Sequence, residues 1–456
     1  MLLSEESIQV SKTFDNIIEK FLEQYAKKND PIEVSFRELV PELSKSDRAT
    51  HLIHTYPAKL LMHIPYFFLN NSIFSKPGDI ILDPFCGSGT VMLESMLAHR
   101  NSIGADANPL ARLITRVKTT KYETRIINRL LKNILNTELD DGLVVPKVGN
   151  LDYWFLPHIQ LGLLKLIEGI KLVEDQKYQD FFWVCFSNCI KKVSLADPRV
   201  SVPVKLNPLR YPEDHRLFKE TQKKIDNLKS INVQEKFVDI VKSNCLKFED
   251  FMQNNSTTSS EVISDDARKI TRKLGCDELL GDETVSLVLS SPPYAGAQKY
   301  IRSSSLNLGW LSYLDEKTTL NLLDSQNIGR ENYKKHEYSV FLPTGINEAD
   351  ELLKDIHTIN PLRAHIASNY LIEMRQAFKE SVRVLKKGGF LILIAANNQV
   401  CGKEFKTQEY LVEILKSLGL KIKLRLIDDI KSYGLMTKRN KTASVITREW
   451  VLVFEK

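Results

Sequence analysis

The pattern of apolar and polar positions predicts alternating strands and helices near the start of the chain. The apolar stretch Ile80-Ile81-Leu82 is typical of a buried strand, and it breaks into a turn that ends at Gly89. Residues 91–97 then follow a helical pattern, residues 102–106 predict a second strand, and a helix is expected from Asn108-Pro109 to about Lys118. Strands that alternate with helices in this way predict a parallel sheet.

The segments on either side lack this rhythm. Residues 1–50 carry apolar positions at helical spacing, which predicts amphipathic helices. Residues 120–236 carry helical patterns and a stretch with several prolines, and the next expected strand is Phe237 to Val241, with Asn244 at its end. We therefore expect a helical subdomain inserted between the second and third strands of the sheet.

The distal part of the chain returns to an α/β pattern. Residues 285–290 predict a buried strand that stops at Pro292-Pro293, and residues 301–365 have no regular pattern. A helix is then expected over 366–386, a strand over 390–395, and two closing strands. The closing strands are expected at 420–428 and 449–455. Together these patterns divide the chain into the segments 1–50, 51–119, 120–236, 237–300, 301–365 and 366–456.

Composition is that of an ordinary globular protein. Of the 456 residues, 26% are charged and 43% are hydrophobic, and no apolar run reaches the roughly 18 residues of a membrane helix. The N-terminus lacks the basic start and apolar core of a secretion signal, so we expect a cytoplasmic protein with no membrane partner. The net charge of +6 permits a polyanionic partner without requiring one.

Cysteine and charge patterns narrow the kinds of site to expect. The six cysteines show no C-x-x-C spacing and the nine histidines no ligand spacing, so neither a disulfide framework nor a metal site is expected. The second half of the 120–236 insert is basic, which indicates either a solvated face or a surface that contacts phosphates. Its basic residues are Lys191, Lys192, Arg199, Lys205, Arg210, Arg216, Lys219, Lys223 and Lys224.

The turn after the first strand has the chemistry of a small-ligand site. Gly87 and Gly89 let the backbone pass close to a ligand, and the helix that follows directs its free N–H groups into the same space. Asp106 follows the second strand, about twenty residues beyond the glycines, where nucleotide-binding folds place an acid that accepts hydrogen bonds from a ribose. The combination predicts a ribose-bearing cofactor.

Ser291-Pro292-Pro293-Tyr294 ends a buried strand with an array of hydrogen-bond acceptors. Two prolines remove two N–H donors, so the Ser291 hydroxyl and the Pro292 carbonyl can accept from a ligand. Such acceptors suit the exocyclic amine of a base, because holding its hydrogens directs the nitrogen lone pair toward an electrophile. Tyr294 would stack on the base plane, as aromatic side chains do with a flipped nucleotide.

The two motifs together resemble a known enzyme family. Asp-Pro-Phe-Cys-Gly-Ser-Gly-Thr at 83–90 and Ser-Pro-Pro-Tyr at 291–294 are similar to motifs of the S-adenosylmethionine-dependent amino-methyltransferases of DNA, which modify cytosine N4 or adenine N6. The resemblance extends to Tyr56-Pro57-Ala58-Lys59 and to Gly104 through Pro109. It implies a Rossmann-like α/β methyltransferase fold with a mostly parallel seven-stranded sheet and a terminal antiparallel hairpin. In the family, variable regions recognise the DNA target, and here either 120–236 or 301–365 could do so.

The resemblance also implies roles for individual residues. S-adenosylmethionine would be bound by Tyr56, Pro57, Lys59, Asp83, Phe85, Gly87, Gly89 and Asp106, and Asn244 stands where the family often places an acid near the adenine amine. The target amine and base would be held by Ser291, Pro292, Pro293 and Tyr294. The implied reaction is direct methyl transfer to double-stranded DNA, with no covalent enzyme intermediate and no metal.

Several assignments of the substrate remain as alternatives. Ser291, where adenine enzymes of the family more usually carry Asp or Asn, favours cytosine N4 over adenine N6. An RNA base methyltransferase is a further alternative, which Ser291 and the segment Tyr56-Pro57-Ala58-Lys59 disfavour. A catalytically silent DNA-binding subunit is another, which Ser291 and Asp106 disfavour. Nothing in the chain resembles a nuclease motif, so a restriction-modification system would need a separate cognate endonuclease.

Overall fold

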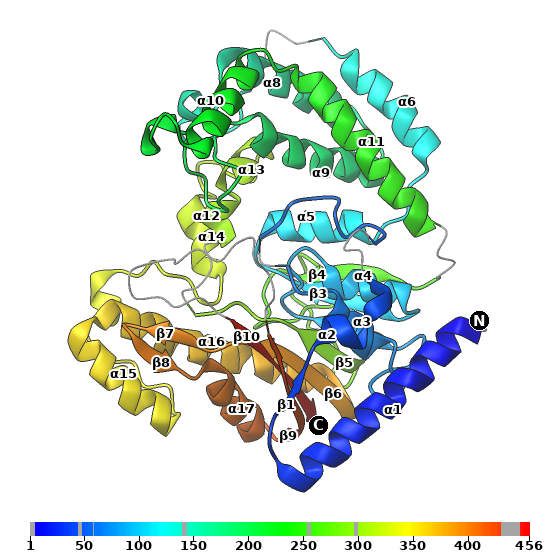
Figure 1. The fold of residues 1–456 in the computed structure, drawn as a ribbon, viewed down its shortest axis with the longest axis vertical. Helices are drawn as coiled ribbons and strands as arrows, with labels where there is room; N and C mark the ends of the chain where they lie inside the picture. Colours follow the sequence, from blue (N-terminus) through cyan, green and yellow to red (C-terminus); the bar gives the residue numbers. More distant parts are fainter. Residues whose placement is uncertain are drawn as a thin grey trace.

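The centre of the molecule is an eight-stranded sheet with the strand order β1-β9-β10-β6-β5-β2-β3-β4 (Figure 1). The computed structural model describes residues 5–43, 48–57, 59–138, 144–252, 257–295, 300–429 and 447–456. The strands of the sheet are β1 (Ile32–Val34), β2 (Ile80–Asp83), β3 (Asn101–Ala105), β4 (Ser260–Ser264), β5 (Val285–Ser290), β6 (Leu385–Ala395), β9 (Lys421–Asp429) and β10 (Arg448–Glu455). A separate antiparallel pair is formed by β7 (Asn398–Val400) and β8 (Lys403–Phe405).

Strand pairing confirms the predicted Rossmann-like methyltransferase sheet. The pairs β3–β4, β2–β3, β2–β5 and β5–β6 are parallel, whereas β10 runs antiparallel to both β6 and β9 and forms the terminal hairpin. One strand exceeds the seven expected: β1 pairs in parallel with β9 at the sheet edge. Residues 1–50 are therefore not helical throughout, because the short run Ile32–Val34 completes the hydrogen bonds of an otherwise unpaired edge.

Short capped helices connect the strands on the cofactor side. The helix α4 (Thr90–Leu97) follows the glycine turn, and α5 (Pro109–Lys118) follows β3. The Asn108 side chain accepts a hydrogen bond from Leu110 N and Pro109 occupies the first helical position, so α5 begins where the sequence predicts. The first residues of the chain form α1 (Glu5–Lys28), α2 (Phe36–Leu39), the 3₁₀ helix η1 (Pro41–Leu43) and α3 (His63–Leu69).

A helical insert stands beyond the β3 and β4 end of the sheet, in the upper part of Figure 1. Its helices pack around an aromatic core that includes Phe181, Phe182 and Phe186 on α9, all fully buried. They are α6 (Thr124–Leu135), α7 (Leu151–Trp154), α8 (Pro157–Lys171), α9 (Gln176–Val193), the 3₁₀ helix η2 (Pro208–Arg210), α10 (Arg216–Lys229) and α11 (Val233–Met252).

The strand predicted at Phe237 to Val241 is wrong, because these residues lie within the helix α11. The short sequence Phe-Val-Asp-Ile-Val is compatible with the spacing of apolar residues in a strand and in a helix. Over a longer stretch, however, the buried positions recur at helical spacing. Phe237, Val241, Asn244 and Phe248 are all buried on one side of α11, against α9 and its neighbours. The third strand of the sheet is instead β4, which begins at the end of the polar stretch 253–260; residues 253–256 lie outside the described residues.

Residues 301–365, expected to be irregular, contain several helices. Trp310, at the end of α13, is fully buried and contacts Phe155 and Phe186 of the helical insert, with ring centroids 5.4 and 6.4 Å apart. The elements are α12 (Tyr300–Ser303), α13 (Ser305–Trp310), α14 (Leu320–Gln326), the 3₁₀ helix η3 (Lys335–Tyr338) and α15 (Asn347–Ile359). They are followed by α16 (Pro361–Val384) before β6 and by α17 (Thr407–Ser417) before β9. Among the described residues, no helix is long and apolar enough to cross a bilayer.

A buried histidine ties the segment before Tyr56 to the helical insert. His54 Nε2 lies 2.9 Å from Ser187 Oγ on α9, and the Lys59 ammonium donates to the carbonyls of His51 and His54 (3.1 and 2.8 Å). Burial, with the nearby Lys59 and Lys118 charges, lowers the pKa of His54 from 6.5 to about 3. The folded protein therefore holds His54 in its neutral form.

This shift predicts a loss of stability in mild acid. The unfolded chain protonates His54 below about pH 6.5 while the folded chain does not, so the stabilisation is complete above that pH and is lost as the pH falls toward 3. Between about pH 7 and about pH 5.5, this one group should lower the free energy of unfolding by about 1 kcal/mol. Urea denaturation should show that His54→Gln, which keeps a partner for Ser187, flattens this dependence; an unchanged slope would contradict the assignment.

Candidate cofactor and target site

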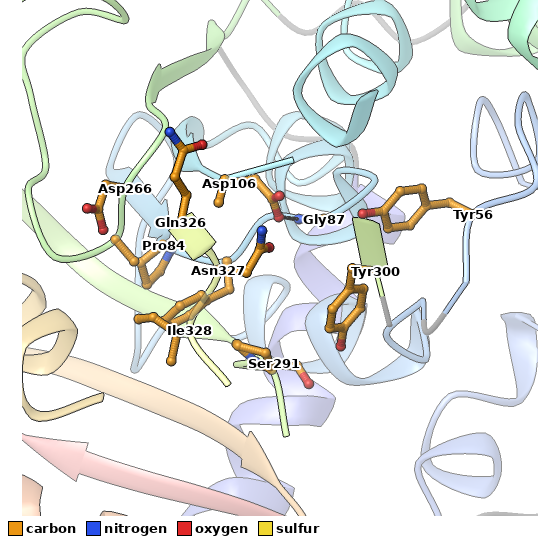
Figure 2. A pocket seen from close by; sticks show the side chains of 14 residues that line it. Tyr56, Pro84, Gly87, Asp106, Asp266, Ser291, Tyr300, Gln326, Asn327 and Ile328 are labelled. Atoms are coloured by element: carbon orange, nitrogen blue, oxygen red, sulfur yellow. Dashed lines mark hydrogen bonds between the residues drawn. The ribbon is translucent and has the colours of Figure 1, made fainter. Parts of the chain in front are cut away.

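A cavity opens at the carboxyl ends of β2, β3, β4 and β5. It lies where the strand order reverses, with β3 on one side of β2 and β5 on the other, and ligands of open α/β sheets bind at such a point. Tyr56, Asp106 and Ser291, from three separate segments of the chain, surround it in Figure 2. Its other lining residues are Pro84, Phe85, Gly87, Ala107, Asp266, Ala267, Pro293, Tyr300, Gln326, Asn327 and Ile328.

The two glycines of the turn after β2 serve different geometric needs. Both have positive φ, 51° at Gly87 and 77° at Gly89, which side chains rarely adopt. A Cβ on Gly89 would lie 2.9 Å from the Thr115 side chain, so this glycine lets the turn pack on α5. Gly87 lines the cavity, and a Cβ there would meet no atom closer than 4.0 Å.

Asp106 presents a fixed carboxylate to the cavity. Its Oδ2 accepts from Gly87 N at 2.9 Å, drawn as a dashed line in Figure 2, and its Oδ1 accepts from Asn108 N at 2.8 Å. Burial raises the pKa of Asp106, and these two hydrogen bonds oppose the rise. Each oxygen keeps a further lone pair for a ligand, because a carboxylate offers about four acceptor positions.

Asp83 lies behind the cavity wall. Its Oδ1 accepts from the Ser290 hydroxyl at 2.6 Å and from Phe85 N at 3.1 Å, and it is not among the residues that line the cavity. Burial raises its pKa to about 7, against these hydrogen bonds. In this arrangement Asp83 joins the ends of β2 and β5 and orients Phe85, which does line the cavity.

The segment Tyr56 to Lys59 divides between the cavity and the body of the protein. The Tyr56 phenol accepts from Asn108 Nδ2 at 3.1 Å and lines the cavity together with Tyr300. Lys59 does not line it: its ammonium holds the carbonyls of His51 and His54, and burial lowers its pKa to about 8. Pro57 is partly buried and lies outside the lining, and Ala58 lies outside the described residues.

Asn244 lies in the helical insert and does not line the cavity. Its amide donates to Ile53 O at 3.1 Å and lies 3.4 Å from Cys185 Sγ. Its expected contact with the cofactor followed from the strand predicted at 237–241, which the helix α11 replaces. The residue that follows the third strand and lines the cavity is Asp266, which the sequence reasoning missed; the apolar pair Val262-Ile263 ahead of it was the available signal.

The wall formed by Gln326, Asn327 and Ile328 was also missed, since nothing in the local sequence marks it. A buried carboxylate holds it in place: Glu373 Oε1 accepts from Arg268 Nη1 at 3.0 Å and from Arg330 Nη1 at 3.3 Å. Arg268 also donates to Gln326 O at 3.1 Å. Burial raises the pKa of Glu373, and the two arginines oppose the rise.

The Ser-Pro-Pro-Tyr segment lies at the carboxyl end of β5. Ser291 and Pro293 line the cavity, whereas Pro292 is buried beside them. The Tyr294 phenol donates to Glu449 Oε1 at 3.1 Å, so it is directed toward the start of β10. Residues 296–299, which follow this segment, lie outside the described residues.

The lining fits a ligand that carries both a ribose and an adenine ring. An anchored carboxylate at Asp106 suits vicinal hydroxyls, and a second carboxylate at Asp266 suits an amine. The apolar groups of Phe85 and Ile328 provide surface for a flat ring. No group of three or more potential metal ligands occurs among the described residues.

Neighbouring acids at the end of β4 allow a controlled test of this fit. Asp266 lines the cavity and forms an ion pair with Arg268, whereas Asp265 is exposed and outside the lining. Asp266→Ala should weaken S-adenosylmethionine binding by about 1 kcal/mol, the scale of one net hydrogen bond, and Asp265→Ala should leave it unchanged. Calorimetric titration that gave equal affinities for the two variants would remove Asp266 from the site.

Comparisons with known proteins agree with this geometry. Residues 12–115 match the family model of N6- and N4-directed DNA methylases. The Type II methyltransferase M.MvaI of Kocuria varians is 24% identical over 81% of this chain and 82% of its own length, and M.BsoBI of Geobacillus stearothermophilus is 22% identical over 99% and 92%. M.MjaII of Methanocaldococcus jannaschii is 38% identical over 21% of this chain and 18% of its own.

Proposed function

We propose, from the premise that this chain belongs to the S-adenosylmethionine-dependent N6 and N4 family of DNA methylases, that it methylates cytosine N4 in double-stranded DNA. The observation that carries the proposal is one shared cavity: the Asp106 carboxylate and the Ser291 hydroxyl line the same space. A cofactor and a target amine bound there would meet without any rearrangement of the sheet. Positioning of this kind supplies a large part of the acceleration in a direct transfer.

The cofactor half of the cavity would be formed by residues at the ends of β2, β3 and β4. Asp106 would accept hydrogen bonds from the ribose hydroxyls, Asp266 would accept from the adenine amine, and Tyr56 would close the methionine end. The bound cofactor supplies an electrophilic methyl group on a sulfonium. Because Gly87 has no side chain, the ligand can approach the backbone closely at this position.

The target half would be formed by the residues after β5. The Ser291 hydroxyl and the Pro292 carbonyl would each accept a hydrogen from the exocyclic amine, and this would hold the nitrogen lone pair toward the methyl group. A base can reach these acceptors only after it leaves the duplex, so the proposal includes base flipping. Ser291 is the residue that favours cytosine N4 over adenine N6.

The identity of the base is tested on DNA methylated by the protein. DNA from cells that express the chain, digested to nucleosides, should contain N4-methylcytosine by mass spectrometry, and DNA from cells with Ser291→Ala should not. N6-methyladenine alone would overturn the cytosine assignment and leave the DNA methyltransferase standing. Methylated nucleosides in RNA with none in DNA would overturn the substrate class.

The basic part of the insert divides into internal and exposed side chains. The Lys191 ammonium donates to the carbonyls of Val200 and Ser201, and Arg199 forms an ion pair with Asp197, so these two basic groups serve the fold. Lys192 and Arg216 are also exposed, and Arg216 forms an ion pair with Glu220. The three remaining exposed cations of this stretch are Arg210 at the end of η2 and Lys219 and Lys223 on α10. We assign the phosphate contacts of this surface to these three residues.

Removing the three exposed cations should weaken DNA binding in a salt-dependent way. Each lost phosphate contact should reduce the slope of log affinity against log salt by about 0.9, so the triple alanine variant of Arg210, Lys219 and Lys223 should lose about 2 to 3 units of slope. The control is the triple alanine variant of Lys12, Lys20 and Lys27, exposed on α1 at the opposite end of the molecule. Equal slopes for the two variants would return the insert to a solvated face.

The cellular setting completes the proposal. The relatives are Type II methyltransferases, and we propose that this chain likewise acts in the cytoplasm as the modifying partner of a separate restriction endonuclease. Its methylation should then protect DNA from that nuclease. Cleavage of DNA taken from expressing cells, at the sites that become methylated, would contradict this role.

A further inference from the structure

The last residue of the Ser-Pro-Pro-Tyr segment makes a contact that base stacking does not explain. Tyr294 follows β5, whereas Glu449 is near the start of β10, and β6 lies between these strands in the sheet. The Tyr294 phenol nevertheless reaches across and donates to Glu449 Oε1 at 3.1 Å. The Glu449 carboxylate is thus held next to Tyr294, the last residue of the Ser-Pro-Pro-Tyr segment.

Glu449 sits among groups that set its affinity for a proton. It pairs directly across the hairpin with Asp428 of β9, whose side chain is buried. Burial raises the pKa of Glu449; the Tyr294 hydrogen bond and the charge of Arg37 on α2 oppose this, and the charge of Asp428 adds to it. Glu449 therefore binds a proton more readily than an exposed glutamate does, and is a stronger base when ionised.

Ser291 completes a path from the cavity to this carboxylate. Ser291 lines the cavity, and its side chain lies near enough to the Tyr294 phenol to affect the pKa of that group. Burial raises the pKa of Tyr294, the charge of Glu449 adds to the rise, and the interaction with Ser291 opposes it. The phenol thus keeps its proton and can pass one on only as it receives another.

The reaction requires an acceptor for one proton. When the amine nitrogen forms its bond to the methyl carbon, the carbon–sulfur bond breaks with its electron pair left on sulfur, and the nitrogen carries one hydrogen in excess. A neutral serine hydroxyl accepts a hydrogen bond but does not retain a proton near neutral pH. A carboxylate within reach of Ser291 would retain this proton.

We propose that Glu449 is this proton acceptor, reached through Ser291 and Tyr294; the inference rests on the proposed function. The amine gives its proton to Ser291 Oγ, the Ser291 hydrogen passes to the Tyr294 phenol oxygen, and the Tyr294 hydrogen passes to Glu449 Oε1. Ser291 and Tyr294 end unchanged, the methylated amine is neutral, and Glu449 is a neutral acid that returns its proton to solvent. Glu449 is a positioning residue in this scheme, since it acts through Tyr294.

The test measures single-turnover methylation of duplex DNA across a pH series. Glu449→Gln keeps an oxygen for the Tyr294 phenol but takes no proton, so its rate should fall about 100-fold, the lower range for general base catalysis, while its affinities for S-adenosylmethionine and DNA stay unchanged. The wild type should lose rate as the pH falls through the pKa of Glu449, and this acidic limb should disappear in Glu449→Gln. Asp428→Asn, which removes the like charge facing Glu449, should move the limb to lower pH.

Two further variants separate the relay from a structural role. Tyr294→Phe keeps the ring but breaks the path, so it should match Glu449→Gln in rate, and the double variant should be no slower than either single one. Glu455→Gln, the same substitution at the other end of β10, should keep the wild-type rate and pH profile.

The outcomes are distinguishable from failure of the proposed function. A wild type that methylates DNA, with Glu449→Gln or Tyr294→Phe at the wild-type rate, or with the acidic limb intact in Glu449→Gln, would overturn the relay and leave the methyltransferase standing. Additive losses in the double variant would overturn it as well. A wild type that transfers no methyl group to DNA would overturn both.

Discussion

Replacing Ser291 by alanine should lower the single-turnover rate of methyl transfer by about 100- to 1000-fold, the cost of removing one preorganised hydrogen-bonding group from a reacting centre. Ser291 lines the same cavity as Asp106, and its hydroxyl is the proposed acceptor for the amine. The variant should bind S-adenosylmethionine as tightly as the wild type, because the hydroxyl acts on the target.

Ser286 on the same strand provides the matched control. Its hydroxyl accepts from the Lys386 ammonium at 3.2 Å near the amino end of β5, whereas the cavity lies at the carboxyl end. Ser286→Ala should therefore keep the wild-type rate. A Ser291→Ala enzyme within about threefold of the wild type would remove Ser291 from the reaction, whatever its effect on base selection.

Replacing Asp106 by alanine should weaken S-adenosylmethionine binding by about 1–3 kcal/mol, the scale of a charged hydrogen bond lost from a buried ligand. Its carboxylate is fixed by Gly87 N and Asn108 N, so little entropy is lost when a ribose binds to it. Calorimetric titration of the purified chain measures the change directly.

Asp106→Asn separates the two duties of this side chain. The amide oxygen can still accept from one backbone N–H, so the turn should keep its conformation while one acceptor for the ribose is lost. We expect an affinity between those of the wild type and Asp106→Ala. Unchanged affinity in Asp106→Ala would place the ribose elsewhere.

Local sequence signals were sufficient to predict the strand, the glycine turn and the helices that surround Gly87 and Gly89. The apolar strand, the positive-φ glycines and the Asn108-Pro109 cap each act within a few residues, so β2, α4 and α5 begin and end close to where the sequence predicts. Asp106 was predicted for the same reason, because its place is set by one short helix, α4, and one short strand, β3. The structure adds that Asp83 and Lys59 serve the fold beside the cavity.

Tertiary contacts decided what the sequence reasoning missed. Phe237 to Val241 forms part of a helix because its neighbours on both sides continue the apolar face that packs on α9, which a five-residue window does not reveal. That error moved the expected third strand, so the candidate chosen after it was Asn244, which lies outside the cavity lining, and Asp266, which lines the cavity, was missed. The wall at 326–328 and the contact of Tyr294 with Glu449 join segments far apart in the chain.

The central claim is that one cavity at the ends of β2 to β5 holds the cofactor and the target amine together. A crystal structure of the complex with S-adenosylmethionine tests it most directly. The account predicts the ribose hydroxyls within about 3 Å of the Asp106 carboxylate and the sulfonium methyl group facing Ser291. A cofactor bound outside this cavity, or with its methyl group directed away from Ser291, would contradict it.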